Sequence, residues 1–165
     1  MSGDLEERVQ RLEDRVAISD VVIRFAYGLD RADWELYGET LADELFVDFT
    51  ESTGMDPRIW TRAEWCGFAA EVLNGFDARQ HISSNHRIDL DGDRATCLSY
   101  MYAQHHLPGA PGGDELLMRG WYEYQLVRTA AGWQIDRLTQ HYTWGTGNDS
   151  IFEASRARFL ASGGS

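Results

Sequence analysis

The chain has 165 residues, a net charge of −12 at pH 7 and an isoelectric point near 4.7. This length fits one domain with a sizeable core, and the negative charge disfavours binding to nucleic acids and to anionic membranes. All 15 basic residues are arginine, so no side-chain amine exists for Schiff-base catalysis.

The first part of the chain has the spacing of amphipathic helices. Asp4 can cap a first helix that runs to about Leu29, and we expect its polar first two turns to project from the body. Its apolar residues recur at helical spacing, at Leu5, Val9, Leu12, Val16, Val21, Val22 and Phe25. After a short break, Asp33 can cap a second helix that runs from Trp34 to about Leu45.

A strand, a loop and a third helix are predicted next. Phe46–Thr50 alternates apolar and polar residues, as a half-buried strand does. Glu51–Arg58 is predicted to be a loop. Thr61 and Glu64 then form a capping-box pattern, which opens a helix that ends near Asn74.

The remainder of the chain is mostly strand. Four long strands are predicted, over Gln80–Leu90, Arg94–Leu107, Glu115–Thr129 and Trp133–Thr143. The pair Asp91-Gly92 is a strong hairpin signal, and Asp149 can cap a last short helix through Phe159. Helices followed by a meander of long strands predict an α+β fold, in which helices cover one face of a strongly curved sheet and leave a pocket at its open end.

We expect a single domain over residues 1–165, with its core in 15–145 and frayed ends at 1–14 and 160–165. Residues 1–20 lack the apolar stretch of a signal peptide, and no apolar run approaches the ~20 residues that cross a bilayer. The two cysteines form neither a disulfide framework nor a metal-binding spacing. These features predict a cytoplasmic protein.

Four of the five histidines fall on two neighbouring predicted strands, namely His81, His86, His105 and His106. Because strand side chains alternate between faces, His81 should share a face with Ser83 and Asn85, and His86 should point to the other face. The face of the second strand that carries His105 has small or soft residues, at Cys97, Ser99, Met101 and Ala103. This face is therefore predicted to line a cavity.

A metal site is the main alternative use of these histidines. It requires three or four ligands that converge on one point. His81 and His86 should diverge, as should His105 and His106, so we expect no bound metal. Asp30 with His81 and His105 is the one facial triad that the pattern leaves open.

Motifs along the chain resemble the SnoaL-like branch of the NTF2-like superfamily. They are Tyr27-Gly-Leu-Asp30-Arg-Ala-Asp33-Trp34, Gln80-His81-Ile-Ser-Ser-Asn85-His-Arg-Ile88, Asp91-Gly92-Asp93-Arg-Ala95, Ser99-Tyr100, His105 and Gly132-Trp133-Gln-Ile135. The likeness covers about residues 15–144. It implies a cone of helices packed on a curved antiparallel or mixed sheet that encloses a pocket.

Members that this chain is similar to include scytalone dehydratase, hexachlorocyclohexane dehydrochlorinase and bile-acid dehydratases. In these enzymes an aspartate near the end of the first helix pairs with a histidine on the first long strand, and the histidine is the general base. By motif position, Asp30 and His81 match that pair. His105 resembles a second pocket histidine, although His106 fits the spacing almost as well.

The resemblance leaves the substrate open. Scytalone dehydratase has a tyrosine directly before its aspartate, where this chain has Leu29. Tyr27, about one helical turn before Asp30, is a candidate to supply a hydroxyl instead. Tyr142 and Trp144, at the end of the last predicted strand, are candidates for the pocket rim.

The combined pattern predicts a cofactor-independent lyase of dehydratase type, or an isomerase, acting on a small, largely apolar cyclic molecule. Asp30 would orient His81, and His81 would abstract a proton, which typically contributes ~10²–10⁴-fold. The groups that could then stabilise the developing charge are Tyr27, Asn85 and His105.

Other functions fit the same fold. Epoxide hydrolases of the limonene type use an Asp-Arg-Asp arrangement, which Arg119 with Asp30 and Asp48 could imitate, and polyketide cyclases are a related alternative. Arg119 is also a candidate partner for an acidic group of the substrate. The fold serves, too, as a non-catalytic module that binds a small ligand or another chain.

The expected partners are a small-molecule substrate and further copies of the chain, with no nucleic acid and no membrane. Tyr100, Tyr102 and Trp121 suit an exposed patch on the outer face of the sheet. We therefore expect a homodimer or homotrimer that forms through this face.

Overall fold

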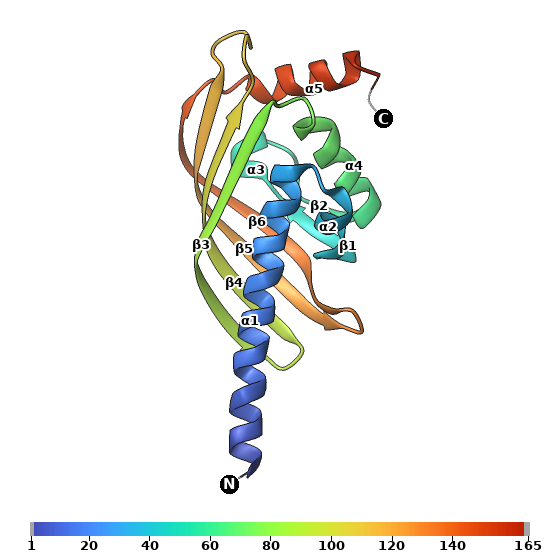
Figure 1. The fold of residues 1–165 in the computed structure, drawn as a ribbon, viewed down its shortest axis with the longest axis vertical. Coiled ribbons are helices and arrows are strands. Elements are labelled where there is room, and N and C mark those ends of the chain that lie inside the picture. The colour runs from blue at the N-terminus through green and yellow to red at the C-terminus, as the bar shows by residue number, and fades with distance from the viewer. Residues whose placement is uncertain (1, 164–165) are drawn as a thin grey trace.

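The computed structural model describes residues 2–163, which form one long helix, four shorter helices and a curved six-stranded sheet (Figure 1). In chain order the elements are α1 (Ser2–Arg31), α2 (Trp34–Glu39), β1 (Leu41–Asp48), α3 (Thr50–Thr53), β2 (Arg58–Thr61), α4 (Arg62–Leu73), β3 (Ala78–Asp91), β4 (Arg94–His106), β5 (Glu115–Thr129), β6 (Gly132–Gly147) and α5 (Ile151–Ala161). None of these helices has both the length and the apolar composition needed to cross a bilayer.

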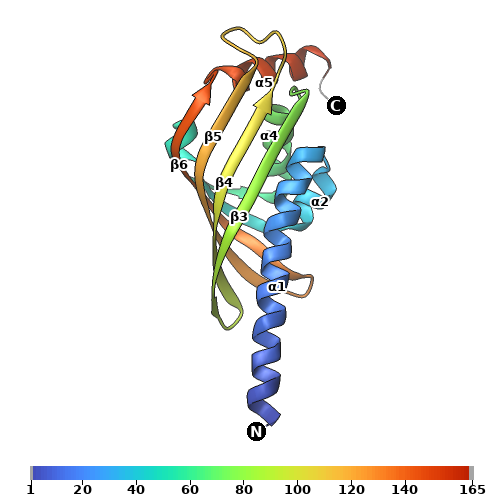
Figure 2. The same ribbon diagram turned by 60° about the vertical axis from the view of Figure 1, so that its left-hand side comes forward.

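The sheet is mixed, with the strand order β2-β1-β6-β5-β4-β3. The four long strands β3 to β6 form an antiparallel meander, and β1 joins β6 in parallel. Figure 2 shows the strands curving around the helices, which gather on the concave side of the sheet. The α+β layout that the sequence predicts is thereby confirmed.

An aromatic core fills the space between the concave face and the helices. The Phe25 ring centroid lies 4.9 Å from that of Tyr37 and 5.5 Å from that of Tyr124. Trp65 donates a 2.7 Å hydrogen bond from Nε1 to the Tyr37 hydroxyl, so these two buried polar atoms are paired. Each buried side chain of this size stabilises the fold by roughly 2–3 kcal/mol.

A partly buried ion pair fixes α1 across the strands. Arg128 on β5 donates hydrogen bonds of 2.8 Å to both carboxylate oxygens of Asp14, and Trp133 donates to one of them at 3.1 Å. These bonds hold the pKa of the Asp14 carboxyl below its usual value, and the hydrogen bond from Arg128 has the largest effect. The part of α1 before Asp14 extends beyond the sheet as a helix (Figures 1 and 2).

The structure thus has residues 2–14 in helical conformation, where we expected a frayed end. At the other end, α5 includes Ala161. Residues 1 and 164–165 of the predicted frayed ends lie outside the described part of the chain.

The second predicted helix is too long. The helix α2 ends at Glu39, and Leu41 already begins β1, so the prediction of a helix to about Leu45 is wrong. A four-residue spacing between Leu41 and Leu45 fits a helix, but it also places both side chains on the same face of a strand, and in β1 both are buried. The pairing with the distant strand β6 decides the conformation, and no local pattern could reveal it.

The predicted strand Phe46–Thr50 corresponds to the end of β1, which stops at Asp48. The helical turn α3 begins at Thr50 and overlaps the start of the predicted loop Glu51–Arg58, and the short strand β2 begins at the last residue of that loop. Trp60 of β2 is 9% exposed and pairs with Leu45 of β1. The helix α4 begins as predicted, because Thr61 and Glu64 form a capping box in which each side chain bonds the other's backbone N–H.

Candidate active site

Asp30 and His81 meet where the last turn of α1 crosses the edge strand β3. Both carboxylate oxygens of Asp30 accept the backbone N–H of His81 at 3.0 Å. Oδ1 also lies 2.7 Å from His81 Nδ1. One carboxylate therefore holds the strand and the imidazole ring together, and the two side chains are only 20% and 10% exposed.

This contact selects a tautomer for the ring. A carboxylate that accepts from Nδ1–H leaves Nε2 with a free lone pair when the imidazole is neutral. Within residues 2–163, Nε2 has no hydrogen-bond partner. Since His81 lines the main cavity, Nε2 is the nitrogen available to a molecule bound there.

The cavity has a volume of about 490 Å³, which suits a small organic ligand. One wall of the cavity is apolar and is formed by α1, α4, α5 and the residues on either side of α3. Its residues are Phe25, Leu29, Phe49, Met55, Trp65, Phe68, Ala69, Val72, Leu73 and Phe152. The charged side chains of Asp149, Glu153 and Arg156 lie at its rim. A second hollow of about 580 Å³ lies between α2 and α4, but it is wide open and contains no histidine.

His105 is the second histidine of the cavity. It is 2% exposed, and its ring centroid lies 5.4 Å from that of His81. Burial, reinforced by the charges of His81 and Arg79, holds the His105 pKa well below 6.5, against a backbone hydrogen bond that raises it. Its Nδ1 is buried and has no hydrogen-bond partner within the described chain.

The choice between His105 and His106 is settled by the sheet. His105 lines the cavity. His106 points to the other face, where its Nδ1 lies 3.3 Å from Glu115 Oε1.

Arg79 braces the end of α1 beside Asp30. Its Nη1 donates to the Leu73 carbonyl at the end of α4 at 2.7 Å, and its Nε donates to the Leu29 carbonyl. Desolvation lowers its pKa, and the charge of Asp30 opposes this shift. The role of Arg79 could not be predicted from the sequence, because no motif marks an arginine that bonds only carbonyl groups.

A second polar group of the cavity lies on β5 and β6. Gln140 donates from Nε2 to the Tyr122 hydroxyl at 3.0 Å and to Met101 Sδ at 3.3 Å, and its Oε1 contacts Ser52. Burial raises the pKa of Tyr122 to about 12, so its hydroxyl stays protonated. Sequence analysis missed Gln140 and Ser52, since only the packing brings them together.

A β-bulge in β3 reverses two predicted orientations. The register with β4 shifts at this point, and Asn85 has a left-handed φ of 58°. Its side chain is exposed and does not line the cavity. His86 turns inward instead, with Nδ1 2.7 Å from Ser19 Oγ on α1. The prediction that His81 and His86 point to opposite faces is therefore wrong.

The bulge removes one reason for expecting no metal site. Even so, in the part of the chain that the structure describes, no three His, Cys, Asp or Glu side chains are grouped to hold a metal ion.

Two predicted contacts of the substrate lie away from the cavity wall. Tyr27 is 53% exposed on the outer side of α1, with the Arg31 guanidinium 5.3 Å from its ring centroid. Tyr142 is half-buried, and its backbone N–H donates to Glu51 at 2.9 Å. Neither of them lines the cavity.

Arg119 and Trp144 lie on the outer face of the sheet. The Arg119 guanidinium is 5.4 Å from the ring centroids of Trp144 and Tyr102. Asp48 accepts from the Thr50 backbone at 3.1 Å. The structure therefore does not assemble Arg119, Asp48 and Asp30 into an Asp-Arg-Asp site.

Comparison with known proteins places this geometry in context. The family model of the SnoaL-like domain matches residues 10–139. Terrestric acid biosynthesis cluster protein E of Penicillium crustosum is 29% identical over 149 residues, covering 86% of this chain and 90% of that protein.

Two solved structures show the same architecture. The Kfla4162 protein from Kribbella flavida superimposes with a TM-score of 0.82 and 27% identity, covering 87% of this chain and 99% of that chain. Hexachlorocyclohexane dehydrochlorinase LinA-type3 from Novosphingobium barchaimii superimposes with a TM-score of 0.73 and 16% identity, covering 85% of this chain and 93% of that chain. The predicted NTF2-like fold is confirmed.

Proposed function

The chain belongs to the SnoaL-like family, and we propose that it is a cofactor-independent lyase whose general base is His81. The observation that carries this proposal is the 2.7 Å contact between Asp30 Oδ1 and His81 Nδ1 at the wall of an apolar cavity. A base held in one tautomer next to a space for a ligand is the arrangement that proton abstraction requires.

In the proposed reaction, His81 Nε2 takes a proton from a carbon atom of the substrate. The electrons of that C–H bond form a new double bond, and the leaving group on the neighbouring carbon departs with its bonding pair, either as halide or, after the His81 imidazolium has protonated the hydroxyl, as water. Asp30 stabilises the imidazolium that forms. The neutral His105 ring, 5.4 Å away between centroids, is placed to hydrogen-bond the charge that develops on the substrate.

The cavity indicates the class of substrate. Its aromatic and aliphatic wall favours a small, largely apolar ring, and its volume of about 490 Å³ limits the size. The Gln140–Tyr122 pair offers a polar contact on the sheet side. The dehydrochlorinase among the structural relatives supports an elimination, with water or halide as the leaving group.

An isomerase would use the same base, with the imidazolium returning its proton to a different carbon. The two reactions differ in one product, because only the elimination releases water or halide. The Asp-Arg-Asp arrangement that the hydrolase alternative would use is not assembled around Arg119, since Arg119 lies on the outer face.

The proposal can be tested with cyclic compounds that carry a hydroxyl or halogen next to an acidic C–H bond. Binding is measured by tryptophan fluorescence. Turnover is measured by mass spectrometry in water labelled with heavy oxygen, which only hydrolysis would add to the product. We expect an unsaturated product without the label. Label in the product would indicate a hydrolase. Compounds that bind the wild-type cavity and are never converted would contradict the proposal and indicate a binding module.

A further inference from the structure

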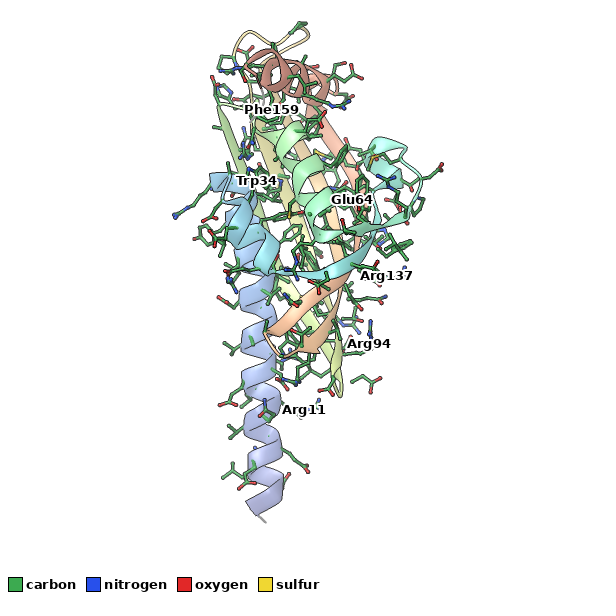
Figure 3. The ribbon with its side chains drawn as sticks, turned by 90° about the vertical axis from the view of Figure 1, so that its right-hand side faces the viewer. Arg11, Trp34, Glu64, Arg94, Arg137 and Phe159 are labelled. Carbon is green, nitrogen blue, oxygen red and sulfur yellow. The ribbon has the colours of Figure 1, made fainter. Side chains whose placement is uncertain are left out.

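The projecting part of α1 carries an apolar stripe that contacts nothing in the body. Leu5, Val9, Leu12 and Val16 are 60%, 45%, 64% and 70% exposed. Between residues 4 and 13, no side-chain hydrogen bond or ion pair to another element exists within the described chain; such contacts begin at Asp14. Figure 3 shows this part of the helix, with Arg11, standing clear of the sheet and of the other helices.

The stripe has the spacing of a coiled-coil seam. Its residues follow one another by steps of four, three and four, which places valine at the a positions and leucine at the d positions of a heptad. The exposed stripe ends at Val16, because Ser19 at the next d position contacts His86 of the body, with 2.7 Å between Oγ and Nδ1. A β-branched residue at a with leucine at d favours a parallel pair of helices.

The charges beside the seam select the same arrangement. Arg8 and Arg15 occupy g positions, whereas Glu6, Glu13 and Asp20 occupy e positions. In a parallel pair each g residue faces the e residue of the next heptad of the other helix. Arg8 would then face Glu13, whereas Arg15 already donates from Nη1 to the Ile88 carbonyl of its own body at 2.7 Å. An antiparallel pair would set arginine against arginine and acid against acid.

The body of the molecule leaves this seam open. Asp14 and Val21, at f positions, are 7% and 6% exposed, and Ile18, at c, is fully buried against the body. The f position is opposite the a and d positions on the helix. Two molecules joined along the seam would therefore place their bodies on opposite sides of the paired helices.

We propose that two copies of this chain associate through a parallel two-stranded coiled coil formed by α1, centred on Leu5–Val16. The occupant is a second copy because the g and e charges of α1 complement those of an identical helix in register. This contact is separate from the predicted contact through the outer face of the sheet. It leaves the cavity of each molecule unobstructed, since the cavity is lined by Phe25 and Leu29 near the other end of α1.

The seam is short, at about 18 Å for the 12 residues from Leu5 to Val16. Isolated coiled coils of this length are weak, because their helices must first form. Here α1 is already helical and anchored by Asp14, so association does not bear the cost of ordering it.

Disulfide formation at the seam tests the proposal in the full-length chain. In a parallel coiled coil, identical d positions face each other, so the variant Leu12→Cys should form a disulfide-linked dimer in a glutathione buffer at equilibrium. The matched control is Glu7→Cys, at an exposed f position on the same part of α1. Circular dichroism checks that both variants fold, and the wild-type chain reports any contribution of Cys66.

We expect Leu12→Cys to give at least tenfold more linked dimer than Glu7→Cys. Adding Arg8→Glu or Glu13→Arg to Leu12→Cys should lower the yield about tenfold, and mixing these two double variants should restore it. Equal yields from Leu12→Cys and Glu7→Cys would overturn the proposal. A mixture that links no better than its components would overturn the parallel arrangement.

Discussion

Neighbouring residues of the same strands meet two different environments in this protein. On the concave face, His105 is 2% exposed and Tyr122 is 6% exposed. On the outer face, His106 has a side chain that is 39% exposed, and Tyr102 is 41% exposed. The two histidines are therefore one position apart and the two tyrosines one strand apart, and each pair has one member shielded from water and one in contact with it.

The two faces differ in the pKa values of their side chains mainly because of burial, and less because of residue type. Loss of water holds the pKa of His105 well below its ordinary value and raises that of Tyr122 to about 12. Both groups stay neutral over the physiological range and remain able to hydrogen-bond a ligand. On the outer face, Arg119 stacks on aromatic rings in contact with water. We therefore expect substitutions on the concave face to change turnover and those on the outer face to leave it unchanged.

The largest effect is expected for His81→Ala. Removing the general base should lower kcat by ~10²–10⁴-fold, while ligand binding in the cavity is retained. The matched control on the outer face is His106→Ala, which should keep wild-type turnover. Steady-state kinetics with a ligand found in the compound screen provide the comparison. Equal losses in both variants would remove the distinction between the two faces.

Asp30→Asn should reduce kcat nearly as much as His81→Ala, because the amide no longer selects one tautomer of the imidazole. The double variant should be little worse than either single variant, since the two residues act as a unit. The cycle of four kcat values measures this coupling. If the fold-loss of kcat in the double variant equals the product of the two single losses, the paired arrangement is contradicted.

The substitution His105→Phe should change how stability depends on pH. Below pH 6.5 the unfolded chain binds a proton at this position that the folded chain cannot bind, so the free energy of unfolding falls as the pH falls. The slope is at most about 1.4 kcal/mol per pH unit for one proton. His86, whose pKa burial also lowers, contributes in the same direction.

In His105→Phe the fall in stability between pH 7.5 and pH 5 should be smaller than in the wild-type chain. Urea unfolding at the two pH values measures it, with His106→Phe as the exposed control. An unchanged pH dependence in His105→Phe would show that the buried ring titrates normally.

The smallest effects are expected on the outer face. Arg119→Gln and Trp144→Leu should each change kcat less than twofold, because both side chains lie on the other side of the sheet from the cavity. A loss in Arg119→Gln comparable to that in His81→Ala would favour a reaction that uses this arginine, such as the epoxide hydrolysis considered from the sequence.

Local signals in the sequence predict much of the fold. The strand β5 has the predicted bounds, Glu115–Thr129, because alternation and flanking turns define it within a few residues. The start of α4 follows from the capping box at Thr61. The end of α2 could not be predicted in the same way. There, Leu41 pairs with Ile135 of β6, a contact between residues far apart in the sequence.

The candidate site divides in the same manner. Motif position brings Asp30 and His81 together, and strand alternation assigns His105 to the concave side. The orientation of Asn85 depends on a one-residue irregularity in β3, which alternation cannot anticipate. Gln140 joins the cavity only through the three-dimensional packing of β6 against α3, so no pattern in its neighbourhood marks it.

Asp30 is expected to hold His81 as a base with Nε2 free toward the cavity, and nitrogen NMR of labelled histidine tests this arrangement without a substrate. At a pH where the ring is neutral, we predict that His81 carries its proton on Nδ1 and that Asp30→Asn abolishes this preference. The spectra of His81→Ala assign the signals. A neutral His81 with its proton on Nε2 in the wild-type chain would contradict the account, because that nitrogen could then accept no proton from a ligand.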